Sequence, residues 1–233
     1  MDYKKLILFD IDGTLIRHVG ESDFASRVQY AAKRAYNVQV SDFDVAHFHG
    51  SVDRDTAWSI LSPSGMTYDA FVDKFDDFSK AMYEYLISKA KNKTLYQEID
   101  DAGKLAKLLK KKTDIALGLL TGNVEKIAYW KLSHAGLKDI FSWGVFGDTA
   151  NDRIELAKTV SHEAFVNFKQ LFRPGEIYIL GDTIYDVRCA KSIGARSIAV
   201  TTGHHGTREE LVAERPDLVV DSLMDEKVIH MLF

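Results

Sequence analysis

Two aspartates stand where a short apolar run ends near the start of the chain. The run Leu6–Asp10 ends in the first of them, and Asp12 follows two residues later. Residues two apart in a strand share a face, so both carboxylates can reach one pocket. Two anions held close together favour a bound cation or a shared proton. A carboxylate in such a place can also attack phosphorus and form an aspartyl-phosphate.

Other groups suited to phosphoryl transfer follow three more apolar runs. They are a hydroxyl with two helix-start amides, a cation, and two further carboxylates: Thr121-Gly122-Asn123, Arg153, and Asp182 with Asp186. In an open α/β sheet, ligands bind beyond the carboxyl ends of the strands, so these groups are expected to meet. Mg²⁺ prefers a shell of hard oxygen ligands, and phosphoryl transfer needs mainly positioning and charge neutralisation. The sequence therefore predicts a site for Mg²⁺ and a phosphate.

Each of these groups has a chemical task in such a site. Thr121, the amides of Gly122 and Asn123, and Arg153 would bind the phosphate. Asp182 adds a carboxylate from a neighbouring strand end, and Asp186 would support it. A second acid beside the nucleophile would protonate the leaving oxygen and then deprotonate the attacking water.

The apolar runs predict the sheet that must position these groups. They are continuous rather than alternating, as in strands buried on both faces of a parallel sheet. The predicted strands are Leu6–Asp10, Ile115–Leu120, Gly144–Phe146, Ile177–Leu180, Ser197–Val200 and Leu218–Val220. Helices are predicted over Asp101–Lys112, Val124–Ala135 with Asn123 as its N-cap, Asp152–Leu171 and Tyr185–Ile193. Strand and helix in alternation predict a doubly wound, Rossmann-like α/β core.

One long segment breaks this alternation. Between Val19 and Thr94 we expect no buried strand, and helical patterns cover Ser22–Tyr36, Arg54–Leu61 and Tyr68–Lys91. This segment is interpreted as an all-helical insert after the first strand. The predicted division is a core of residues 1–18 and 95–233 and a cap of residues 19–94, joined by hinges near 17–20 and 91–97.

Composition restricts the partners. A net charge of −4 and a pI near 6.1 give no basic surface for nucleic acid or an acidic membrane. No apolar run approaches the roughly 20 residues that span a bilayer. The single cysteine, Cys189, allows no internal disulfide framework. We therefore expect a soluble, cytoplasmic protein that acts on a small phosphorylated metabolite.

The motifs closely resemble those of the haloacid dehalogenase superfamily, in its capped, phosphoglycolate phosphatase-like branch. The resemblance is carried, in the right order and spacing, by Asp10-Ile11-Asp12-Gly13-Thr14-Leu15, Leu119-Leu120-Thr121-Gly122-Asn123 and Gly181-Asp182-Thr183-Ile184-Tyr185-Asp186. It implies that Asp10 is the nucleophile and Asp12 the acid/base. It also implies Mg²⁺ held by Asp10, the backbone carbonyl of Asp12, and Asp182, with Asp186 in support.

For two parts of the family pattern, this chain offers more than one candidate residue. The superfamily usually carries a lysine in its third motif; here the candidates are Arg153, favoured because it lies nearer the strand end, and Lys158. The family also reads its substrates with a cap loop that contains a glycine. The residues of that kind are His49, Gly50, Asp53 and Arg54.

The leading hypothesis is a Mg²⁺-dependent phosphatase. Relatives that cleave carbon–halogen or phosphonate bonds lack an acid at the position of Asp12, so this residue argues against those activities. A sugar phosphomutase of the same superfamily is the nearest alternative, because it would use the same motifs. A phospho-receiver signalling module is a third, although its single small domain would leave an insert of about 75 residues unexplained.

Overall fold

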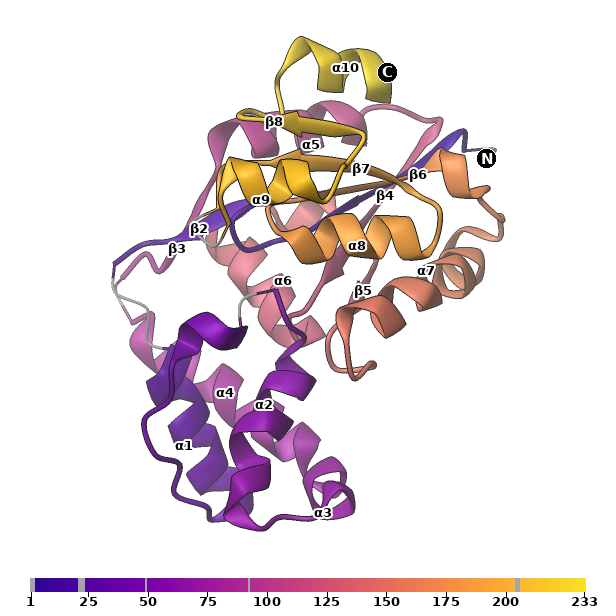
Figure 1. Cartoon of the computed structure of the whole chain (residues 1–233). Coiled ribbons are helices and arrows are strands. Elements are labelled where there is room, and N and C mark those ends of the chain that lie inside the picture. The colour runs from indigo at the N-terminus through magenta and orange to yellow at the C-terminus, as the bar shows by residue number, and fades with distance from the viewer. Residues whose placement is uncertain (1–2, 21–23, 49, 92, 204–205) are drawn as a thin grey trace.

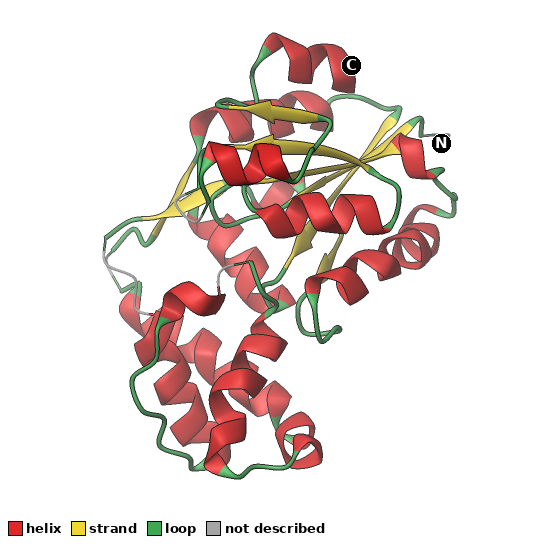
Figure 2. Ribbon diagram, in the orientation of Figure 1, coloured by secondary structure: helices red, strands yellow, loops and turns green. Residues whose placement is uncertain are grey.

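A parallel sheet forms the centre of the molecule. The computed structural model describes residues 3–20, 24–48, 50–91, 93–203 and 206–233. Six strands lie in the order β5-β4-β1-β6-β7-β8, and every neighbouring pair is parallel (Figure 2). In that order they span Gly144–Phe146, Ile115–Thr121, Lys5–Phe9, Ile177–Gly181, Arg196–Val200 and Leu218–Val220. These are the six apolar runs of the sequence, so the predicted sheet is confirmed.

Helices cover both faces of this sheet (Figure 1). On one face lie α5, α6 and α10, which span Asp100–Lys110, Glu125–His134 and Glu226–Leu232. On the other face lie α7, α8 and α9, which span Arg153–Phe168, Ile184–Ser192 and Arg208–Ala213. Strand β1 shows why both faces are apolar: Ile7 and Phe9 join the first cluster, and Leu6 and Leu8 join the second. The doubly wound α/β core is therefore confirmed.

The helical insert has an apolar core of its own. Its helices α1, α2, α3 and α4 span Phe24–Tyr36, Asp53–Leu61, Tyr68–Asp73 and Phe75–Lys89, and a 3₁₀ turn covers Val45–Phe48. The rings of Phe71 and Phe78 are fully buried among them, and Ile127 of α6 packs against the same cluster. The single helix predicted over 68–91 is therefore two helices, because Lys74, at φ −115° and ψ 13°, leaves the helical conformation between them.

Two short strands join the insert to the core. Strand β2, Ile16–His18, pairs antiparallel with β3, Tyr96–Glu98. They lie within or beside the two segments expected to be hinges, and Figure 1 shows them side by side between the sheet and the helical insert. Sequence patterns did not predict them, because three residues are too few to establish an alternating period. No helix in the described part of the chain is both long and apolar enough to cross a membrane.

Packing against β4 offers a direct test of this architecture. Gly118 lies in the middle of the strand, and a Cβ added there would clash with the ring of Trp143 and lie 3.0 Å from Leu8. Gly118→Ala should therefore destabilise the protein by about 1–3 kcal/mol in a urea unfolding experiment, since the core has no room for another methyl group. The control is Gly175→Ala, whose new methyl meets nothing within 4 Å. Equal stability of the two variants would contradict the packing described.

Candidate active site

The strand order places the sequence motifs at one edge of the sheet. Asp10 follows β1, and its backbone N–H donates to the carbonyl oxygen of Leu180 at 2.9 Å. Strands β4 and β6 flank β1, so Thr121 at the end of β4 and Asp182 just after β6 lie on either side of Asp10. Residues more than 100 positions apart in the chain therefore meet through the parallel topology alone.

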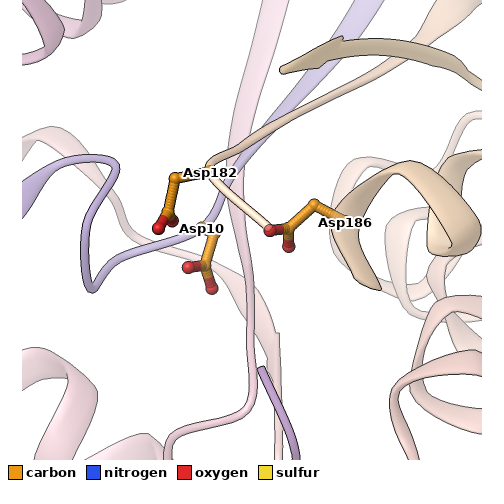
Figure 3. A group of neighbouring side chains, drawn as sticks. All are labelled: Asp10, Asp182 and Asp186. Carbon is orange, nitrogen blue, oxygen red and sulfur yellow. The ribbon is translucent and has the colours of Figure 1, made fainter. Parts of the chain in front are cut away.

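Three carboxylates gather at this edge. One oxygen from each of Asp10, Asp182 and Asp186 lies within 4.8 Å of the others, and all three residues are buried (Figure 3). Burial, with the charge of Asp186 added, raises the pKa of Asp10 to about 7 although Arg153 opposes the shift. Burial and the charges of Asp10 and Asp186 also raise the pKa of Asp182 well above its ordinary value. This group of described residues could hold a metal ion.

Arg153 is the cation that contacts this cluster. It is the first residue of α7, after the N-cap Asp152, whose side chain accepts from the N–H of Glu155 at 2.8 Å. Its Nη1 lies 3.2 Å from Asp10 Oδ1, and its Nη2 donates to Asp186 Oδ1. Burial works against its charge, but Asp186 and Asp10 outweigh burial and raise the pKa of Arg153. Lys158 is exposed on the same helix.

Asp186 is already fully engaged by protein donors. Its Oδ1 accepts from Arg153, and its Oδ2 accepts from the backbone N–H and the hydroxyl of Thr183 at 3.0 and 2.6 Å. Asp182 differs: its Oδ1 accepts from the hydroxyl of Thr14 at 2.9 Å, whereas its Oδ2 is buried and has no partner within the described chain. Asp182 therefore retains the buried oxygen that is available to a ligand.

Asp12 lies in a different environment from Asp10. Its Oδ2 accepts from Lys131 Nζ at 2.6 Å and from Asn123 Nδ2 at 2.7 Å. Burial tends to raise its pKa, but the charge and hydrogen bond of Lys131, with the hydrogen bond of Asn123, hold the pKa of Asp12 below its ordinary value. Its side chain keeps 42% of its surface exposed, so it remains open to a bound molecule.

The turn after β4 holds its residues through side-chain hydrogen bonds. Thr121 Oγ1 accepts from the backbone N–H and from Nδ2 of Asn123, at 3.3 and 2.9 Å. The N-cap of α6 is Val124 and not Asn123, so that prediction was wrong. The Asn123 amide is instead bonded to Asp12, Thr121 and Lys131, whose Nζ donates to Asn123 Oδ1 at 2.6 Å.

The cap loop packs directly on this turn. The N–H of Asp53 donates to the carbonyl oxygen of Gly122 at 2.7 Å, and Asp53 Oδ2 accepts from the N–H of Val124 at 3.0 Å. A Cβ added at Gly122 would clash with the carbonyl oxygen of Ser51. Asp53 thus ties the start of α2 to the start of α6.

The other cap residues predicted from the sequence have different neighbours from Asp53. Gly50, at φ +79°, approaches the ring of Tyr185 so closely that a Cβ there would clash with it. Arg54 lines a cavity of about 280 Å³ with Trp58 and four others, Asp55, Tyr68, Phe71 and Asn151. Its Nη1 lies 3.4 Å from the carbonyl oxygen of Asp148. His49 lies outside the described residues.

Sequence reasoning missed two cations near Asp12. Lys131 is 5% exposed on α6, and Arg27 is 4% exposed on α1 of the insert. The signal was present: both stand among small or apolar residues on the buried face of a helix, where lysine and arginine are rare unless paired. Sequence patterns predicted both helices, but the chain gives no sign that Lys131 and Arg27 would approach Asp12.

Comparisons with known proteins find one family model that matches most of the chain. The model of the haloacid dehalogenase-like hydrolase family matches residues 4–194. The phosphoglycolate phosphatase of Vibrio vulnificus is 25% identical over 94% of this chain and 92% of its own length, and that of Vibrio parahaemolyticus is 27% identical over 95% and 93%.

Solved structures share the fold over nearly the whole chain. One of a predicted phosphoglycolate phosphatase from Haemophilus somnus has a TM-score of 0.68 at 20% identity and covers 98% of both chains. A beta-phosphoglucomutase from Clostridium difficile has a TM-score of 0.67 at 19% identity and covers 99% of this chain and 97% of its own. The resemblance drawn from the motifs is thus confirmed, and the chain belongs to the haloacid dehalogenase-like hydrolase family.

Proposed function

We propose that this chain is a Mg²⁺-dependent phosphatase that hydrolyses a small phosphorylated metabolite through an aspartyl-phosphate on Asp10. The observation that carries the proposal is the meeting of three buried carboxylates with Arg153 at the carboxyl edge of the sheet. A site with this composition can bind a cation and a phosphate together. The phosphatase names of the curated relatives support the same activity.

The residues present fit a magnesium ion. All the available donors are hard oxygens, the three carboxylates repel one another, and Asp182 Oδ2 is buried without a partner in the described structure. Asp10, Asp182 and the backbone carbonyl of Asp12 would hold the ion. Asp186 would act in support, because Arg153 and Thr183 already occupy both of its oxygens. A bound Mg²⁺ would neutralise negative charge on the phosphoryl oxygens.

The protein's own residues would then perform two successive displacements. A carboxylate oxygen of Asp10 attacks phosphorus, and the bond from phosphorus to the leaving oxygen breaks. Asp12 gives that oxygen a proton, then accepts one from the water that attacks the aspartyl-phosphate and releases inorganic phosphate. Arg153, the Thr121 hydroxyl and the amides of Gly122 and Asn123 would orient the phosphoryl group.

The helical insert would serve as a cap over this site. In the proposed division, residues 19–94 form the cap and residues 1–18 and 95–233 the core. The β2–β3 pair would carry the hinges, and the contacts of Asp53 with Gly122 and Val124 would hold the cap closed. Closure of this kind excludes water and completes a site before reaction.

A sugar phosphomutase is the second candidate. The likeness in fold to a beta-phosphoglucomutase favours keeping it, since the two activities would share this core. An assay with a hexose phosphate and trace bisphosphate separates them, because a mutase isomerises the sugar whereas a phosphatase steadily releases phosphate. Membership of a hydrolase family stands against the phospho-receiver alternative.

Removing either acid tests the proposed chemistry. Asp10→Asn should abolish turnover of p-nitrophenyl phosphate with Mg²⁺, because the amide cannot form the intermediate. Asp12→Asn should lower kcat by about 10²–10⁴-fold through loss of acid–base catalysis. The control is Asp139→Asn, which changes an exposed aspartate of the core. Retained turnover in Asp10→Asn would refute the assignment of the nucleophile.

The raised pKa of Asp10 predicts how magnesium affects stability. Because the folded pKa of about 7 exceeds the unfolded value near 4, ionising Asp10 costs the metal-free protein stability as pH rises through that interval. Magnesium at 100 times its Kd should raise Tm by roughly 5–10 °C at pH 8. At pH 5.5 the rise should be smaller, because protons compete for the carboxylates. Equal shifts at both pH values, or a full shift in Asp182→Asn, would contradict the metal site.

The contact of Lys131 with Asp12 predicts a change in the pH profile. Lys131 stabilises the ionised carboxylate, so Lys131→Met should raise the pKa of Asp12. The limb of the kcat/KM profile governed by Asp12 should therefore move to higher pH. Lys126→Met, on the exposed side of the same helix, should leave that limb in place. A shift to lower pH in Lys131→Met would show that another group governs the limb.

A further inference from the structure

The loop of residues 147–152 leads directly into the cation of the active site. Arg153 follows it as the first residue of α7, and its buried side chain is bonded to Asp10 and Asp186. The core holds the backbone of this residue from one side, because the thiol of Cys189 donates to the carbonyl oxygen of Arg153 at 3.1 Å. The placement of the guanidinium therefore depends on where the loop sets the start of α7.

The core fixes both ends of this loop. At its start, the N–H of Gly147 donates to the carbonyl oxygen of Asn123 at 2.9 Å, and a Cβ added at Gly147 would clash with the carbonyl oxygen of Gly122. At its end, the N–H of Asn151 donates to Glu155 Oε2 at 3.2 Å. The loop thus lies against the turn after β4 at one end and joins the first turn of α7 at the other.

The helical insert contacts the same loop at two points. The hydroxyl of Tyr68, the first residue of α3, donates to Asn151 Oδ1 at 2.7 Å. Arg54 Nη1, in α2, lies 3.4 Å from the carbonyl oxygen of Asp148. Tyr68, Arg54 and Asn151 all line the cavity of about 280 Å³ described above. The insert therefore reaches the loop within two residues of Arg153.

The ring of Tyr68 is oriented by its neighbours in the insert. It lies edge-on to Trp58, with ring centroids 5.1 Å apart, and tilted against the fully buried Phe71 at 6.0 Å. Its own side chain is exposed, so the apolar core of the insert does not depend on its hydroxyl. A phenylalanine at this position would keep the ring contacts and lose the hydrogen bond to Asn151.

We propose that Tyr68 is a positioning residue for the reaction, which holds the loop before Arg153 in place through its hydrogen bond with Asn151. This inference rests on the proposed phosphatase function and adds to it a residue that acts through Arg153 and not on the substrate itself. Docking of the insert then sets Arg153 against Asp10, so the phosphate site is complete only when the insert is in place. Small displacements of groups that orient the reacting atoms lower the rate steeply.

The test compares Tyr68→Phe with the wild-type protein on p-nitrophenyl phosphate and Mg²⁺. Loss of one hydrogen bond should lower kcat/KM by about 2- to 10-fold, because Arg153 is held less firmly beside Asp10. Asn151→Ala removes the acceptor and should have the same effect, and the double variant should be no worse than either single variant. The matched control is Tyr30→Phe, which changes an exposed tyrosine in α1 of the same insert and should retain the wild-type value.

Hydrogen exchange measured by mass spectrometry gives a second readout that needs no turnover. In Tyr68→Phe, the amides of residues 147–156 should exchange faster than in the wild-type protein, while those of α8 should exchange at the same rate. No turnover by the wild-type protein would refute the proposed function without affecting this comparison. Unchanged exchange of residues 147–156, an unchanged kcat/KM in Tyr68→Phe, or additive losses in the double variant would overturn the role of Tyr68.

Discussion

The repulsion among three buried carboxylates at the end of β1 and β6 governs the rest of the site. Asp10, Asp182 and Asp186 lie close together, and burial strengthens the repulsion between their charges, which raises the pKa of Asp10 and of Asp182. Arg153 compensates part of this charge from one side, where it contacts two of the three. The remaining demand for positive charge is what a metal ion would supply, and a phosphoryl group would then be drawn to the same place.

The second acid has different hydrogen-bond partners from this cluster. Asp12 is only two residues from Asp10, yet its carboxylate turns to Lys131 and Asn123 and its pKa moves in the opposite direction. Two neighbouring carboxylates with different environments can take different chemical tasks. In the proposed mechanism, Asp10 bonds to phosphorus and Asp12 carries protons.

Much of this arrangement was predictable from local patterns. Continuous apolar runs located all six strands of the sheet, and the polar residues after them identified the groups that meet at its edge. Arg153 was preferred over Lys158 on its distance from the strand end, and the structure places Arg153 against Asp10. The order of the parallel strands was enough to bring these groups together. Because crossover helices connect parallel strands, the carboxyl ends of all these strands lie at the same edge of the sheet.

The parts that escaped prediction depend on contacts between the insert and the core. Arg27 and Lys131 both lie within electrostatic reach of Asp12. The residues next to them in the sequence give no sign of this, because it depends on how α1 and α6 dock against the rest of the protein. Asn123 is a residue type that often serves as an N-cap, but its side-chain amide donates to Asp12 instead, and Val124 is the N-cap of α6. The β2–β3 pair likewise forms only because two distant linkers meet.

A crystal structure of the protein with Mg²⁺ and beryllofluoride tests the central claim most directly, because beryllofluoride bonded to a carboxylate mimics an aspartyl-phosphate. The account predicts beryllium bonded to an Asp10 oxygen, the metal ion in contact with Asp182, and Arg153 beside the fluorides. Beryllofluoride on another residue, or a metal ion bound away from Asp10, would contradict it.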